Sequence, residues 1–353
     1  KIIKMSDVPS KKAIGFISHG SGSASFNFDA DEKGEYVLTF VFHKSMAKKK
    51  QYMQIHINGK MYEIFFPETK GFSPLGRQQI IVELKEGTNN MTIKNPVATA
   101  IDSSYIQYKR MGDALKEASS MWAKVTHSEE KPITYSICEW GMARPYLWGA
   151  KAGSMWRTTP DIAPNWRSIT MIYNRTLKLY KYSGPGHWND PDMLEVGNGK
   201  LDDNENRAHF SLWCMLAAPL MLGNDIRSFV SNGMPDKDNE TLKIVTNKHM
   251  IAVDQDSLGK SAKRIKKESG IDIIARPLSN GDVALCLFNT ASSTKSVNFK
   301  LDDLTKDPYL GIEESPSGYE LHDLWTDERS TGTTINATIP KHSTVVYRVK
   351  PTI

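Results

Sequence analysis

The order of apolar and polar positions divides the chain into three regions. In the first region, from about residue 12 to residue 109, apolar and polar residues alternate with a period of two. An Asn-Gly pair at Asn58 and Gly59, between two of the alternating runs, is a strong signal for a β-hairpin. Short strands at this spacing predict a β-sandwich. The clearest runs are residues 24–28, 36–42, 51–57 and 79–84.

The second region, from about residue 111 to residue 256, alternates strand-like and helix-like segments. Residues 133–138 predict a short apolar strand, and residues 206–218 have helical spacing with one apolar side. Residues 219–223 follow as a predicted buried strand. Segments that alternate in this way are typical of parallel βα units.

The third region, from about residue 262 to residue 353, returns to the alternation of strands. Its predicted strands are residues 272–276, 283–288, 297–301 and 345–349. The pattern therefore predicts two all-β domains on either side of an α/β domain. We place these three domains at residues 1–108, 109–260 and 261–353.

Composition excludes several classes of protein. A formal net charge of +5 over 353 residues is mild, and the arginines are not gathered on one helix, which argues against a nucleic-acid partner. Three cysteines without a Cys-x-x-Cys pair argue against a disulfide framework and against a zinc site. The longest apolar stretch, residues 212–223, is interrupted by Pro219 and is too short to span a membrane. The oligomeric state stays open.

The candidate chemistry lies in the α/β region. Six of the eight tryptophans fall between Trp140 and Trp213, among carboxylate, guanidinium and amide side chains. Flat aromatic rings pack on a pyranose ring while charged groups bind its hydroxyls in paired hydrogen bonds, so the mixture is typical of a sugar site. These side chains are Glu139, Arg157, Asp161, His187, Asn189, Asp190 and Asp192. Four polar clusters follow predicted strands, and the carboxyl ends of parallel barrel strands meet on one face. The clusters are Glu139, Asp161, Asp190 with Asp192, and Asn224 with Asp225.

Five motifs in this region resemble glycoside hydrolase family 27, the family of the α-galactosidases. They are YSICEWG at residues 135–141, WRTTPDI at 156–162, GPGHWNDPDM at 184–193, APLMLGND at 218–225 and NKHMIAVDQD at 247–256. The resemblance implies that residues 109–260 are the second half of a (β/α)8 TIM barrel. By position, residues 261–353 match the family's C-terminal antiparallel β-sandwich. Residues 1–108 resemble a carbohydrate-binding module inserted into the barrel.

The resemblance also implies a retaining mechanism, in which two carboxylates lie about 5–5.5 Å apart. Asp161 matches the family's general acid/base, and a general acid is expected to be buried so that it holds its proton near neutral pH. Arg157 is expected to bind sugar hydroxyls and to hold the carboxylates of the site. The mechanism requires neither a metal nor a cofactor.

Other positions are implied to line the sugar pocket. Glu139 matches the residue near the 2-position of the sugar, where relatives acting on N-acetylgalactosamine carry a small residue, so glutamate favours galactose. Cys138 is expected beside it, and Asp192 and Met193 at the end of the seventh barrel strand. Asp190 is interpreted as a structural residue of the Asn-Asp-Pro turn.

The sequence departs from the family at the first half of the barrel. The paired-Asp motif and the Lys-Tyr-Asp strand with the nucleophile are not found in it, although residues 108–115 match the helix that follows that strand. We therefore expect the nucleophile upstream of these residues, and the 353 residues alone to be inactive. The expected substrate is terminal α-linked galactose in oligo- or polysaccharides, which places the protein outside the cytoplasm, in the extracellular space or the periplasm. The alternatives are α-N-acetylgalactosaminides or β-L-arabinopyranosides as substrates, or a non-catalytic carbohydrate-binding protein.

Overall fold

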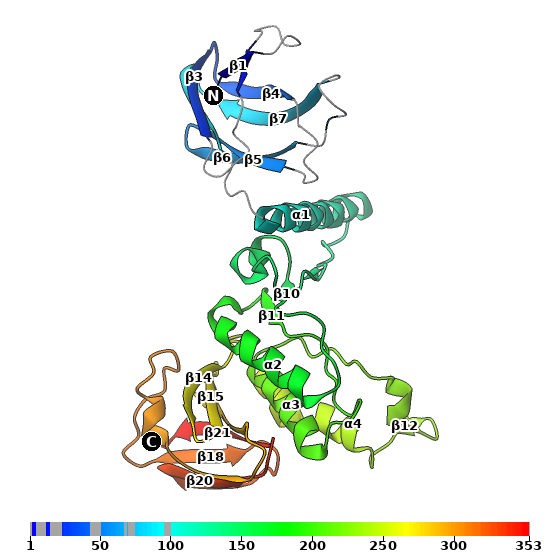
Figure 1. Cartoon of the computed structure of the whole chain (residues 1–353), viewed down its shortest axis with the longest axis vertical. Helices are drawn as coiled ribbons and strands as arrows, with labels where there is room; N and C mark the ends of the chain where they lie inside the picture. Colours follow the sequence, from blue (N-terminus) through cyan, green and yellow to red (C-terminus); the bar gives the residue numbers. More distant parts are fainter. Residues whose placement is uncertain are drawn as a thin grey trace. The chain divides into compact units, whose positions relative to one another are not determined.

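The computed structural model describes residues 2–4, 12–14, 23–42, 51–66, 69, 75–94 and 100–352. The chain forms two compact units, Lys1–Met111 and Gly112–Ile353. Helix α1 (Ala100–Thr126) begins in the first unit and ends in the second. Figure 1 shows the elements of both units.

The first unit is built from antiparallel strands. Its larger sheet has the order β3-β8-β5-β6, and β4 pairs with β7 in a second sheet. Side chains of both sheets, among them Ile55, Ile57 and Val82, meet in one buried core, as the alternation predicts for a β-sandwich. Asn58 and Gly59 both have positive φ and form the predicted hairpin turn between β5 and β6. The strands are β1 (Ile2–Lys4), β2 (Lys12–Ile14), β3 (Ser23–Ala30), β4 (Gly34–Phe42), β5 (Gln51–Ile57), β6 (Lys60–Phe66), β7 (Gly76–Leu84) and β8 (Gly87–Lys94).

The second unit begins with the α/β segment, whose three short parallel strands have the order β11-β10-β9. Gly112 of α1 lies so close to the backbone of Ala152 that an added Cβ would be 2.0 Å from its carbonyl oxygen, so only glycine fits there. The strands are β9 (Ser136–Ile137), β10 (Met155–Arg157), β11 (Trp188–Asp190), β12 (Val230–Ser231) and β13 (Met234–Pro235). The α-helices are α2 (Trp166–Thr176), α3 (Asp203–Met215), α4 (Glu240–Val245) and α5 (Lys248–Asp254). The 3₁₀ helices are η1 (Pro145–Leu147), η2 (Gly149–Lys151), η3 (Leu177–Tyr182) and η4 (Ile226–Phe229).

The prediction of a strand at residues 219–223 is wrong. Only one parallel bridge forms there, between Leu194 and Leu222. The partner segment turns away directly afterwards, because Asn198 N donates to Glu195 O. A ladder cannot extend beyond the last residue of its partner, so the segment stays irregular.

The C-terminal segment is a β-sandwich with the expected antiparallel strands. Its six-stranded sheet has the order β14-β15-β16-β21-β18-β19, and β17 pairs with β20. The strands are β14 (Lys263–Glu268), β15 (Ile271–Pro277), β16 (Val283–Asn289), β17 (Lys295–Lys300), β18 (Tyr319–Asp323), β19 (Arg329–Gly332), β20 (Thr334–Ile339) and β21 (Thr344–Pro351), with the 3₁₀ helix η5 (Leu301–Leu304).

Both faces of the six-stranded sheet are buried at β15 and β16. Ile273 and Leu285 belong to the core inside the sandwich, whereas Ile274 and Cys286 pack into a core shared with α2 and α3. The α/β segment and the sandwich therefore fold as one compact unit. In the described part of the chain, none of the helices has an apolar stretch of the length that a bilayer requires.

Asp254, in α5, makes the stability of this unit dependent on pH. Its side chain is buried, and its Oδ1 has no hydrogen-bond partner among the described residues. Burial raises the pKa of Asp254 to about 7, with the charge of Arg276 opposing the effect. A folded state that binds a proton more tightly than the unfolded chain loses stability as the pH rises, here between about pH 4 and pH 7.

We expect Asp254→Asn to remove this loss, because an amide stays neutral at every pH. The gain in free energy of unfolding over the parent should be about 2–3 kcal/mol larger at pH 8 than at pH 5. Guanidinium unfolding at both pH values measures the difference, with the exposed Asp238→Asn as control. Equal gains at both pH values would contradict the prediction.

Candidate active site

The site is built at the carboxyl ends of two neighbouring parallel strands. Arg157 of β10 pairs with Asp190 of β11, and Thr158 N donates to Asp190 O at 2.9 Å. Trp156 fixes this arrangement from inside, since its buried indole Nε1 donates to Asn189 Oδ1 at 2.8 Å. Pro191 follows β11 directly and Pro160 lies three residues beyond the end of β10; because proline cannot donate to a ladder, the chain leaves the sheet at the same edge after both strands.

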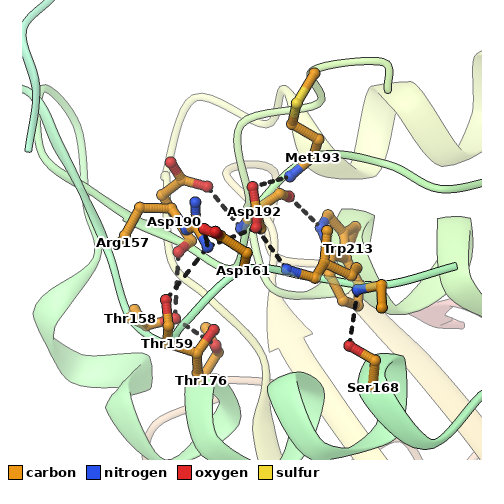
Figure 2. Close-up of polar contacts among 12 residues, drawn as sticks. Arg157, Thr158, Thr159, Asp161, Ser168, Thr176, Asp190, Asp192, Met193 and Trp213 are labelled. Atoms are coloured by element: carbon orange, nitrogen blue, oxygen red, sulfur yellow. Dashed lines mark hydrogen bonds and ion pairs between the residues drawn. The ribbon is translucent and has the colours of Figure 1, made fainter. Parts of the chain in front are cut away.

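Arg157 joins two carboxylates that come from different strands. Its Nη2 lies 2.5 Å from Asp192 Oδ2 and 3.1 Å from Asp161 Oδ1. Dashed lines in Figure 2 mark both contacts. The guanidinium is buried, and its Nε has no hydrogen-bond partner among the described residues. A buried guanidinium needs negative charge beside it, so Arg157 holds the two aspartates at one point.

Asp192 is the most constrained carboxylate of the group. Its Oδ2 accepts from Ile162 N at 2.7 Å, and its Oδ1 accepts from Met193 N at 2.9 Å. Its backbone has a φ of 88°, a conformation that non-glycine residues rarely adopt. The neighbouring Asp190 Oδ1 accepts from Asp192 N at 2.8 Å and so supports this turn, as its interpretation as a structural residue predicts. Burial raises the pKa of Asp190, against the charge of Arg157.

Asp161 does not have the burial expected of it. Its side chain is 65% exposed, because it follows Pro160 on the rim and only one oxygen reaches back to Arg157. The exposed carboxylate is thus anchored on one side and open to an approaching molecule on the other. In Figure 2 it faces the same guanidinium as Asp192.

Glu139 and Cys138 lie at the end of the next strand, β9. Glu139 Oε2 accepts from Ala143 N at 2.6 Å, and burial raises the pKa of Glu139. The turn after it packs on the end of β10, since a Cβ on Gly141 would lie 2.2 Å from Thr158 O. Cys138 is exposed.

The structure thus brings three of the predicted residues into contact and arranges the others around them. Arg157, Asp161 and Asp192 are joined by ion pairs, and the exposed Met193 follows Asp192 directly. Glu139 and Cys138 occupy the neighbouring strand end, where Glu139 accepts from Ala143 N.

Sequence reasoning missed one residue of the site. Trp213 of α3 is completely buried, and its Nε1 donates to Asp192 O at 2.8 Å. It holds the strained turn from behind, opposite Arg157. Trp213 lies on the apolar side of its helix, where an indole that only packs gives the same pattern, so no signal in the sequence separates the two roles.

Comparisons with known proteins show which family the second unit is similar to. Residues 98–256 match the family model described as alpha galactosidase A, and residues 268–349 match the model of the alpha galactosidase C-terminal beta sandwich domain. The α-galactosidase of Cyamopsis tetragonoloba is 37% identical over 254 residues, which are 70% of this chain and 58% of that protein. The α-galactosidase A of Cellvibrio japonicus is 35% identical over 254 residues, 67% of this chain and 60% of that protein.

Solved structures give the same result. The α-galactosidase I of Mortierella vinacea superposes with a TM-score of 0.62 at 27% identity, covering 73% of this chain and 66% of that one. The α-galactosidase of Saccharomyces cerevisiae superposes with a TM-score of 0.58 at 25% identity, covering 73% and 71%.

The chain spans less than two thirds of the length of the relatives that it matches in sequence. The two family models nevertheless account for both segments of the second unit, the partial (β/α)8 barrel and the sandwich that packs on it. The resemblance that the motifs indicate is confirmed, and the chain belongs to glycoside hydrolase family 27, the α-galactosidase family.

Proposed function

We propose that this chain is part of a retaining glycoside hydrolase that releases terminal α-linked galactose from oligo- or polysaccharides. One observation carries the proposal: Arg157 holds Asp161 and Asp192 together at the carboxyl ends of adjacent strands. In (β/α)8 enzymes that end of the barrel holds the active site. The relatives at 30–37% identity are named α-galactosidases.

In this proposal Asp161 is the general acid/base. It first gives its proton to the glycosidic oxygen while the bond from that oxygen to the anomeric carbon breaks and a carboxylate attacks the carbon. Asp161 then removes a proton from a water molecule. This water attacks the anomeric carbon, displaces the attacking carboxylate from it and so releases galactose. The exposed face of Asp161 suits contact with a leaving group that enters from solvent. Arg157 balances its charge when the proton is absent.

Asp192 fits the role of a positioning or sugar-binding residue better than that of the nucleophile. Both of its oxygens already accept hydrogen bonds from backbone amides, and one also binds Arg157. A carboxylate with its lone pairs occupied in this way is a weak attacking group. We propose that the nucleophile comes from the part of the family's barrel that these 353 residues do not match, and that they alone do not hydrolyse galactosides.

The experiment uses the full-length protein as its gene encodes it, beside the 353-residue chain. We expect the full-length protein to hydrolyse a nitrophenyl α-galactoside, with the α-anomer of galactose as the first product in proton NMR. The 353-residue chain should bind galactose weakly or not at all and should release no nitrophenol. Release of the β-anomer first, or binding of galactose by the full-length protein without turnover, would overturn the proposal; the second outcome describes a carbohydrate-binding protein.

Glu139 is proposed to select galactose at the 2-position, with Cys138 and Met193 as neighbouring pocket walls. We expect Glu139→Ser in the full-length protein to shift the ratio of kcat/KM toward a nitrophenyl α-N-acetylgalactosaminide by roughly 10- to 200-fold, because a smaller residue makes room for the acetamido group. Glu129→Ser, at an exposed position, is the matched control. An unchanged ratio of kcat/KM would show that Glu139 does not line the sugar pocket. The parent's rate on a nitrophenyl β-L-arabinopyranoside tests the other family alternative.

We also propose that the protein acts in the extracellular space or the periplasm, because galactose-containing polysaccharides are met there. Cell fractionation followed by detection with an antibody tests this location. Detection only in the cytoplasmic fraction would contradict it.

A further inference from the structure

Two histidines and an aspartate converge at a place unrelated to the candidate active site. His249 lies in α5, His322 in β18, and Asp327 in the turn that leads from β18 to β19. His322 Nε2 is 2.5 Å from Asp327 Oδ1, and His249 Nε2 is 3.4 Å from the same oxygen. One nitrogen or oxygen atom of each residue lies within 4.8 Å of the others. The two imidazole rings are 4.9 Å apart and almost perpendicular.

The backbone around the cluster is firmly held. Asn247 caps α5 by accepting from His249 N and Met250 N, and its Nδ2 donates to Leu324 O at 3.1 Å. Asp327 N donates to Asp323 O at 3.0 Å, which closes the turn. The helix that carries His249 and the turn that carries Asp327 are thus bonded to each other. A site assembled on such a framework loses little entropy when a ligand binds.

The charged neighbours are already paired with one another. Arg329 Nη1 lies 2.9 Å from Glu320 Oε1, and Arg348 Nε lies 2.5 Å from Asp282 Oδ2. Asp327 instead faces the two imidazoles. Burial lowers the pKa of His249, and the hydrogen bond from His322 lowers the pKa of Asp327, so a neutral imidazole and an ionised carboxylate are the forms present near neutral pH. These are the forms that bind metal ions.

A cavity of about 340 Å³ borders both histidines. Its wall also includes Asn280, whose polar side chain suits ordered water. An ion held by the three residues would have room on this side for a water molecule or a small anion. Three protein ligands with one open position is the arrangement of open zinc sites.

We propose that His249, His322 and Asp327 form a binding site for a divalent transition-metal ion of the zinc type. Two imidazoles and one carboxylate are the donor set that favours zinc and its neighbours over magnesium or calcium. With bonds of about 2.0–2.1 Å, tetrahedral donors lie roughly 3.4 Å apart, the separation that His249 and Asp327 already have. The ion binds His322 Nε2 once the proton of the neutral imidazole is on Nδ1, and the exposed Asp327 side chain moves outward by about 1 Å to restore the spacing.

The absence of a Cys-x-x-Cys pair argued against a zinc site, but this signal says nothing about sites made of histidine and aspartate. The three residues here lie far apart in the chain and meet only when α5 packs beside β18. A bound ion would tie the α/β segment to the sandwich. It would therefore stabilise the folded unit by mass action.

The test uses the intact 353-residue chain, stripped of metal with a chelator and titrated with Zn²⁺ in a calorimeter. We expect one ion to bind per chain with a micromolar dissociation constant and to raise Tm by several degrees. Mg²⁺ should produce neither effect. Asp327→Asn and His249→Gln should each weaken Zn²⁺ binding by at least about tenfold. Asparagine accepts the φ of 64° at position 327, so the turn stays intact.

The matched control is His342→Gln. His342 Nδ1 lies 2.7 Å from Glu205 Oε1, and among the described residues this histidine–carboxylate pair is not part of a group of three potential metal ligands. This variant should bind Zn²⁺ as the parent does. The inference is wrong if Zn²⁺ leaves Tm unchanged, or if Asp327→Asn and His249→Gln bind it as tightly as the parent while retaining the parent's circular dichroism. None of these measurements depends on hydrolytic activity.

Discussion

In the full-length protein, Asp161→Asn is expected to lower kcat/KM for methyl α-galactoside by 10² to 10⁴, about 3–5 kcal/mol in transition-state free energy. Methoxide is a poor leaving group and needs the proton that an amide cannot give. For dinitrophenyl α-galactoside the loss in kcat/KM should be far smaller, since that leaving group departs without protonation. The test compares the two substrates in steady-state kinetics.

The second step of the reaction offers an independent measurement. Without Asp161 as a base, water attacks slowly, whereas azide attacks without giving up a proton. Azide should therefore accelerate turnover of the dinitrophenyl substrate by Asp161→Asn and leave the parent unaffected. Asp31→Asn makes the same chemical change at an exposed position distant from Asp161 in the sequence, and it serves as the control. Equal losses on both substrates, with no response to azide, would show that Asp161 is not the acid/base.

The sequence predicts best those structural features that depend on residues close together in the chain. The hairpin at Asn58 and Gly59 has positive φ at both positions, as its dipeptide requires. Arg157 and Asp190 are the paired last residues of β10 and β11, with Pro160 and Pro191 soon after them, which places both residues at one edge of the sheet. The contact of Arg157 with the two aspartates follows from this edge and from the opposite charges.

The sequence does not predict what depends on distant contacts. The exposure of Asp161 depends on which segments cover the rim, and the local pattern does not contain that information. Trp213 looks like an ordinary core residue until its indole is seen on Asp192 O. Residues 219–223 have the composition of a buried strand, yet a strand also requires a partner of equal length, which Leu194 alone does not provide.

The second large effect is expected at Asp272, where α2 meets the six-stranded sheet. Asp272 is completely buried, and its two oxygens accept from Arg264 at 2.5 and 2.6 Å and from Tyr173 at 2.8 Å. Asp272→Ala leaves a partly buried guanidinium and a buried hydroxyl without their partner. We expect a loss of about 3–5 kcal/mol in free energy of unfolding, measured with guanidinium. Tm should fall by about 10 °C.

We expect most of this loss of stability to come from the unpaired charge of Arg264. Two further variants separate the effect of this charge from the effect of the missing hydrogen bonds. Tyr173→Phe removes one hydrogen bond and should cost about 1 kcal/mol. The triple variant Asp272→Leu, Arg264→Met, Tyr173→Phe removes every polar group together and should regain much of what Asp272→Ala loses, since no buried charge remains uncompensated. A triple variant as unstable as Asp272→Ala would mean instead that the ion pair itself holds α2 on the sheet.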